Sequence, residues 1–162
     1  MPLTNRGNWL CSDIMILYTI GYTRKSLREF IACLRDAGVD AVIDVRLRNT
    51  SQLAGFSKRD DLAFLLPEGF GIAYDHRPEM APTQEILDAY KRDGDWSAYE
   101  RAFLPLLEER AVEEIGQQLL TVYRRPCFLC AEPTADGCHR RLVAEYLAEK
   151  LADREIEIVH LT

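Results

Sequence analysis

The sequence lacks any apolar run of the roughly 20 residues that a membrane span requires. Its longest continuous apolar stretch covers residues 14–20 and follows Asp13. Residues 1–12 hold one arginine and no apolar signal core, so we expect a cytosolic protein that is not exported and has no membrane partner. Repeats, low-complexity tracts and blocks of like charge are also missing, and nothing marks a linker between domains.

An excess of basic residues is missing as well. The chain has 20 Lys and Arg against 26 Asp and Glu, which gives a net charge of -6. This balance argues against a protein that coats nucleic acid non-specifically, but it leaves room for a local basic pocket. The five cysteines are an odd number in a chain without an export signal, which indicates reduced thiols rather than a disulfide framework.

What the sequence does have is the size and composition of one soluble globular domain. It has 162 residues, of which 48% are hydrophobic and 28% charged. A chain of this size needs no metal or disulfide to be stable. We expect residues 14–162 to form the domain and residues 1–13 to be a poorly ordered N-terminal extension.

Strand-like and helix-like segments alternate along the chain. Apolar runs typical of strands cover residues 14–20, 41–45, 72–74, 128–131 (with 127 as an alternative start) and 156–161. Helices are expected to begin near Ser26, Ser57, Thr83, Asp95 or Ser97, and Cys138. Ser26 and Glu29 have the spacing of a capping box, and the helix that begins at Asp95 or Ser97 is expected to continue through Leu119. This alternation predicts an α/β fold: a single three-layer domain with a mainly parallel, Rossmann-like sheet of about five strands flanked by helices.

The ends of the predicted strands are rich in basic residues. In open α/β sheets, ligands bind beyond the carboxyl ends of the strands. The segments after the first four strands carry seven of the chain's 20 Lys and Arg residues. Two helix starts, near Ser26 and Cys138, add free backbone N–H groups to the same edge. We expect an anionic small molecule there, such as a nucleotide or another compound with a phosphate or carboxylate group. A nucleic acid is a further possible partner. The alternative is that these cations only form exposed ion pairs.

Four residues of zinc-ligand type lie close together: Cys127, Cys130, Cys138 and His139. In a strand, residues three apart point to opposite faces, so Cys127 and Cys130 would not hold one ion. We therefore predict no metal site, and the cofactor is left unknown.

Thiol chemistry is the other interpretation of these cysteines. Cys138 would lie in the first turn of a helix beside Arg140 and Arg141, and such surroundings lower the pKa of a thiol. Phosphatases and sulfurtransferases also place a cysteine near an arginine in a strand–loop–helix setting. Cys130 is either a resolving partner for Cys138 or, as we favour, a small buried hydrophobe. For Cys138, a nucleophilic and a structural role both stay open.

Other titratable residues stand at strand ends. His76 is either a proton-transfer group or, as we prefer, a hydrogen-bonded structural residue. Asp44 and Arg46 end a buried strand, where charges are costly unless they are paired, so they either pair or fix a ligand. His160, in the last strand, is expected to be structural.

The chain also carries a set of short motifs in order: Thr19-Ile20-Gly21-Tyr22, Ser26-x-x-x-Phe30, Asp44-Val45-Arg46, Phe56, Tyr74-x-His76, Leu129-Cys130-Ala131-Glu132 and Cys138-His139-Arg140. Over residues 18–161 this order resembles the family catalogued as domain of unknown function 488. The resemblance implies a small bacterial or archaeal cytosolic α/β domain and no particular activity. The chain departs from the family pattern at Asn49, where many members have proline, and at Met80-Ala81-Pro82, which replaces Leu-Gly-Gly. Cys127 is outside the pattern, which also counts against zinc.

We predict an enzyme that acts on an anionic substrate at this edge of the sheet. The catalytic candidates are Cys138, His139, His76 and Glu132. The substrate-binding candidates are Gly21, Tyr22, Asp44, Arg46, Tyr74, Cys130 and Arg140. Arg46 and Arg140 are expected to hold the negative charge. The alternatives are a non-catalytic nucleotide or nucleic-acid binding module and a thiol-redox or metal-binding protein. The oligomeric state is not indicated.

Overall fold

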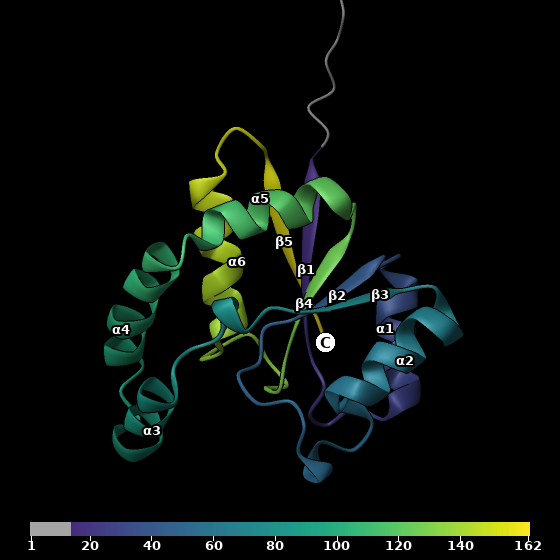
Figure 1. Ribbon diagram of the computed structural model, residues 1–162, viewed down its shortest axis with the longest axis horizontal. Coiled ribbons are helices and arrows are strands. Elements are labelled where there is room, and N and C mark those ends of the chain that lie inside the picture. The colour runs from purple at the N-terminus through teal and green to yellow at the C-terminus, as the bar shows by residue number, and fades with distance from the viewer. Residues whose placement is uncertain (1–13) are drawn as a thin grey trace, which may run out of the picture.

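The computed structural model describes residues 14–162, and the predicted extension at residues 1–13 lies outside this range (Figure 1). The centre of the fold is a parallel sheet in the order β3-β2-β4-β1-β5. Its strands are β1 (Met15–Gly21), β2 (Ala41–Asp44), β3 (Ala73–His76), β4 (Pro126–Cys130) and β5 (Ile156–Leu161). The predicted α/β fold is confirmed.

Helices cover both faces of the sheet (Figure 1). They are α1 (Leu27–Asp36), α2 (Arg59–Phe70), α3 (Gln84–Asp93), α4 (Trp96–Glu109), α5 (Val112–Val122) and α6 (His139–Lys150). Phe30 of α1 and Leu66 of α2 belong to the core on one face, and Phe103 of α4 and Leu147 of α6 to the core on the other. Within residues 14–162, no helix combines the length and apolar character needed to cross a membrane.

The start of α1 follows the predicted capping box. Ser26 Oγ accepts a hydrogen bond from the Glu29 N–H at 3.2 Å, and Glu29 Oε2 accepts one from the Ser26 N–H at 2.7 Å. These bonds satisfy backbone donors that the first helical turn leaves free. The helix then buries Phe30, Ile31 and Leu34 on one side. Local sequence therefore determines where this helix begins and which side faces the sheet.

The next helix begins later than predicted. Ser57 ends a 3₁₀ helix, η1 (Gln52–Ser57), and its hydroxyl binds Arg46 and the Ala54 carbonyl instead of capping α2. The helix also runs past Pro67 and ends where Gly71 adopts a φ of 64°. Glycine adopts this left-handed conformation without the steric cost that other residues meet.

The chain leaves the neighbouring strands β1 and β4 toward opposite faces of the sheet. β1 continues into α1 on one face and β4 into α6 on the other, which is the arrangement beside which open α/β sheets bind ligands. Backbone hydrogen bonds join the two departing segments, from the Tyr22 N–H to the Cys130 carbonyl at 3.3 Å and from the Thr23 N–H to the Ala131 carbonyl at 3.1 Å. Cys130 thus lies at the topological switch point of the fold.

Candidate functional site

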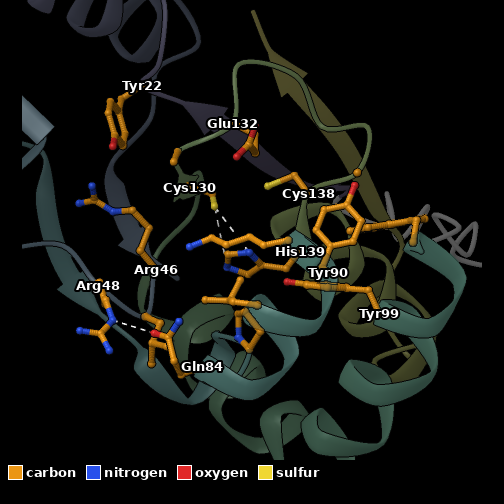
Figure 2. A pocket seen from close by; sticks show the side chains of 17 residues that line it. Tyr22, Arg46, Arg48, Gln84, Tyr90, Tyr99, Cys130, Glu132, Cys138 and His139 are labelled. Carbon is orange, nitrogen blue, oxygen red and sulfur yellow. Dashed lines mark hydrogen bonds between the residues drawn. The ribbon is translucent and has the colours of Figure 1, made fainter. Parts of the chain in front are cut away.

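A cavity of about 390 Å³ opens at this switch point (Figure 2). Of the predicted site residues, it is lined by Tyr22, Arg46, Cys130, Glu132, Cys138 and His139. The other predicted residues do not line it: Gly21, Asp44, Tyr74, His76 and Arg140. The predicted edge of the sheet therefore does form a hollow, but only about half of the candidates face it.

Cys130 and His139 form a thiol–imidazole pair in the cavity (Figure 2). The Cys130 Sγ lies 3.6 Å from Nδ1 of His139, and His139 Nε2 lies 2.7 Å from the Val45 carbonyl oxygen. A carbonyl only accepts hydrogen bonds, so Nε2 carries the hydrogen and Nδ1 presents its lone pair to Cys130. Burial lowers the pKa of His139, which favours the neutral ring. The geometry places a base beside a thiol.

Arg140 lies behind the cysteines as a fully buried side chain. Its Nη1 donates to the Glu132 carbonyl at 2.7 Å and to Cys138 Sγ at 3.3 Å, and its Nε donates to Thr19 Oγ1 at 3.2 Å. Among residues 14–162, no carboxylate lies within ion-pair distance of this guanidinium, and its Nη2 has no hydrogen-bond partner. A buried cation requires a compensating anion, and thiols are the acidic groups beside it.

The pKa values of the two thiols, Cys130 and Cys138, are shifted in opposite directions. The hydrogen bond from Cys138 lowers the pKa of Cys130, whereas burial raises it. Hydrogen bonds from the backbone of Ala131 and Glu132 and the charge of Arg140 lower this pKa further. The same thiol–thiol contact, together with burial, raises the pKa of Cys138. The expectation that Cys138 has a lowered pKa is wrong, because this thiol supplies the hydrogen that Cys130 accepts. Cys130 is the more acidic thiol of the pair.

Asp44 and Arg46 pair with each other. Arg46 Nε and Nη2 donate to the two carboxylate oxygens of Asp44 at 2.8 and 2.7 Å. The Tyr74 hydroxyl and Asn49 Nδ2 also donate to Asp44 Oδ2, at 2.5 and 3.0 Å, and Ser57 accepts two further bonds from Arg46. Arg46 thus uses four of the five N–H groups of its guanidinium, and one N–H group is left for a ligand. The role of Arg46 in holding an anion stays a prediction.

The remaining histidines have backbone or hydroxyl partners. His76 Nε2 donates to the Arg46 carbonyl at 2.9 Å, and His160 Nδ1 lies 2.7 Å from Thr19 Oγ1. These contacts, with the position of His76 outside the cavity, favour the structural role that we preferred for both. Glu132 differs from them because it is exposed and lines the cavity (Figure 2).

Helices α3 and α4 supply a cavity wall that the sequence did not predict: Gln84, Leu87, Tyr90, Lys91, Trp96 and Tyr99. The Trp96 and Tyr99 rings stack with their centroids 4.7 Å apart, and Tyr90 meets both edge-on. Arg48 Nε donates to Gln84 Oε1 at 2.8 Å, which ties the segment after β2 to α3. The helical spacing of these residues was visible in the sequence. The side of the sheet on which the helices pack was not.

Cys130, Cys138 and His139 also resemble the ligands of a soft metal ion. Their ligand atoms all lie within 4.8 Å of one another, and Zn²⁺ accepts a Cys₂His set with a fourth position open. However, the Arg140 guanidinium that donates to Cys138 Sγ opposes a second positive charge there. Cys127 belongs to the core on the opposite face, so it cannot complete a four-ligand site. The charges of the site fit thiol chemistry better.

Gly21 permits a close approach between β1 and the loop after β4. A methyl group at Gly21 would lie 1.6 Å from the Glu132 carbonyl oxygen, which also accepts the bond from Arg140. Gly21→Ala is therefore expected to displace this loop and to lower the free energy of unfolding by about 1–3 kcal/mol, measured by urea denaturation. In the control Gly69→Ala, the added methyl group meets its nearest atom at 3.6 Å, so it should stabilise α2 by about 0.5–1 kcal/mol. Equal losses in the two variants would contradict this prediction.

Comparison with known proteins gives one match. Residues 26–147 match the family model described as Domain of unknown function DUF488. The matched segment contains the carboxyl ends of β2, β3 and β4 and the cysteine–histidine cluster. It confirms the resemblance that the short motifs indicate. Searches of curated proteins and of solved structures gave no significant match.

Proposed function

Since the chain belongs to the DUF488 family, whose description names no activity, we propose a function from its site: an enzyme in which the Cys130 thiolate attacks an anionic substrate. The observation that carries this proposal is the buried Arg140 guanidinium, which has thiols and no carboxylate beside it among residues 14–162.

A buried arginine that only joined backbone segments would leave an uncompensated charge in the core. Such a charge is strongly destabilising unless an anion balances it. A thiolate shared between Cys130 and Cys138 provides that anion, and the hydrogen bond from Cys138 concentrates the negative charge on Cys130. A thiolate is also the reactive form of cysteine. The same arrangement therefore accounts for both the buried cation and a nucleophile at the cavity.

The reaction that fits these positions is covalent catalysis. The Cys130 thiolate forms a bond to the electrophilic atom of the substrate while the bond to the leaving group breaks. The leaving group takes a proton from Glu132 at the rim or from solvent water. The backbone N–H groups of Ala131 and Glu132 stabilise negative charge that develops next to the sulfur.

The charges around the cavity support an anionic substrate. Arg48 and Lys91 line it in addition to the one free N–H of Arg46, and Glu132 is the one carboxylate among its lining residues. A surplus of positive charge in a hollow raises the local concentration of anions. A volume of about 390 Å³ suits a small molecule that carries a phosphate or carboxylate.

A non-catalytic nucleotide-binding role is the second candidate. It is favoured by the aromatic wall of Tyr90, Trp96 and Tyr99, because aromatic side chains stack on nucleobases. Adenosine monophosphate should then protect Cys130 from alkylation at much lower concentration than ribose 5-phosphate does. Equal protection by the two compounds would show that the nucleobase does not contribute to binding.

Alkylation tests the nucleophile and the anion site together. Near pH 7, Cys130 is expected to react with iodoacetamide at least about tenfold faster than Cys33 in the same sample, because the pKa of Cys130 is lowered and the thiolate is the reactive form of cysteine. Negatively charged iodoacetate should be favoured further at Cys130, because the cavity attracts anions. Peptide mass spectrometry measures both rates at each cysteine.

Lys91→Gln should reduce the preference of Cys130 for iodoacetate, whereas Lys150→Gln, at the far end of α6, should not change it. Alkylation of Cys130 no faster than that of Cys33 contradicts the proposed nucleophile. A preference for iodoacetate that is equal at Cys130 and Cys33 contradicts the anion site. For catalysis, hydrolysis of 4-nitrophenyl phosphate should be lost in Cys130→Ser and kept in Cys127→Ser, since Cys127 lies on the opposite face.

A further inference from the structure

We infer that Cys130 and Cys138 are a redox pair: a hydroperoxide oxidises Cys130, and Cys138 resolves the product as an intramolecular disulfide. The inference goes beyond the proposed function and rests on the same Cys130 nucleophile. It gives Cys138 a chemical role in addition to its hydrogen bond to Cys130.

The geometry brings these two thiols, and no others of residues 14–162, together at the cavity. Cys130 ends β4, Cys138 caps α6, and their Sγ atoms lie within 4.8 Å of each other. Formation of a disulfide bond requires these Sγ atoms to approach to roughly 2 Å. Both residues line the cavity, so a small peroxide reaches them. Cys127 is buried on the opposite face, and Cys33 is on α1.

The first step consumes the peroxide. The Cys130 sulfur attacks one oxygen of the hydroperoxide, the O–O bond breaks, and Cys130 becomes a sulfenic acid. The sulfur is oxidised by two electrons, and the peroxide is reduced to an alcohol or to water. The departing oxygen takes up from solvent in the cavity the equivalent of the proton that Cys130 released when it became a thiolate.

The second step uses Arg140. Once Cys130 is a neutral sulfenic acid, it no longer opposes a negative charge on Cys138, and the guanidinium that donates to Cys138 Sγ at 3.3 Å stabilises the new thiolate. The Cys138 sulfur attacks the Cys130 sulfur, the S–O bond breaks, and the hydroxide leaves with the Cys138 proton as water. The sum is two thiols and one hydroperoxide giving one disulfide, one alcohol or water, and one water.

The test treats the full-length protein with one equivalent of hydrogen peroxide and then blocks free thiols with iodoacetamide. Trypsin with a protease that cleaves before aspartate separates the two cysteines, because Asp136 lies between them. We expect peptides 125–135 and 136–140 to be linked by a disulfide that dithiothreitol removes. Cys127→Ala should keep the link and thereby assign it to Cys130. Cys138→Ala should instead accumulate a Cys130 sulfenic acid, which the probe dimedone traps.

The outcomes separate this inference from the proposed function. Fast alkylation of Cys130 without a Cys130–Cys138 link after peroxide treatment overturns the redox pair and leaves the proposed nucleophile standing. Slow alkylation of Cys130 together with no link overturns both. A link that forms equally in Cys130→Ser joins other cysteines and also overturns the pair. Loss of the link in an unfolded variant is recognised by circular dichroism, and the wild-type and Cys127→Ala proteins then decide the question.

Discussion

Asp44→Asn is expected to lower the free energy of unfolding by about 3–5 kcal/mol, because it leaves the buried Arg46 guanidinium without its counter-charge. Asp44 is 0% exposed and Arg46 is 4% exposed. Two hydrogen bonds join the pair, and Asp44 also accepts bonds from Tyr74 and Asn49. Urea denaturation at neutral pH measures the loss.

The loss should depend on pH in a defined direction. Burial alone would raise the pKa of Asp44, but the hydrogen bonds and charge of Arg46 and the bonds from Tyr74 and Asn49 outweigh it and lower that pKa. The carboxylate therefore adds its full stabilisation above the unfolded-state pKa of about 4, and this stabilisation is lost as the pH falls through the folded-state pKa. The difference between wild type and Asp44→Asn should shrink below about pH 4.

A double-mutant cycle identifies the pairing as the cause. Arg46→Met removes the uncompensated charge, so Asp44→Asn combined with Arg46→Met should lose less stability than the sum of the single variants. The half-exposed pair of Asp75 and Arg77 is the control, because exposed ion pairs contribute only about 0–1 kcal/mol. Additive losses at Asp44 and Arg46 would show that the two side chains do not stabilise the fold as a pair.

The fold was predictable because its signals are local in the sequence. Residues 14–20 form a continuous apolar run, as a strand buried on both faces requires, and β1 covers nearly the same range. The capping box at Ser26 likewise identifies the start of α1 from two residues three positions apart. The single long helix predicted after Asp95 is instead divided into α4 and α5 at Ala111, whose φ of 50° interrupts it. Apolar spacing alone did not reveal this break.

The site was only partly predictable, because the sequence gives positions near an edge but not the partners of each side chain. Cys130, Cys138 and His139 were expected at one edge and do line one cavity. Arg140 was expected in the same hollow, yet its side chain runs back to Thr19 on β1. Asn49, which stands where the family often has proline, donates to Asp44. Such pairings depend on packing between segments distant in the chain.

The acidity of the thiols shows why partners decide the chemistry. A helix N-terminus beside basic residues predicts an acidic Cys138, and Cys138 does cap α6. The contact with Cys130 reverses the direction of the pKa shift, because the hydrogen bond from Cys138 to Cys130 and the burial of Cys138 both disfavour a charge on Cys138. The backbone at Ala131 and Glu132 favours the anion on Cys130. Only the folded β4–α6 loop brings these groups together.

Arg140→Met tests whether the buried guanidinium is the counter-ion of the thiolate. Removal of the positive charge is expected to raise the pKa of Cys130. The midpoint, which is the pH at which Cys130 reacts with iodoacetamide at half its maximal rate, should therefore rise by about one pH unit or more. Arg140→Lys keeps a charge at the same place and should restore much of the shift. Alkylation that is quenched at set times over a range of pH, followed by peptide mass spectrometry, gives the midpoint.

Arg141→Met is the matched control, because Arg141 is the next residue on α6 and pairs with Glu100 and Glu145 rather than with the thiols. It should leave the midpoint of Cys130 unchanged. If Arg140 only joins the β4–α6 loop to β1, Arg140→Met will change thermal stability while the midpoint stays where it is in the wild type. A midpoint that moves in Arg140→Met, stays in Arg141→Met and returns in Arg140→Lys identifies charge, and not loop geometry, as what makes Cys130 a thiolate.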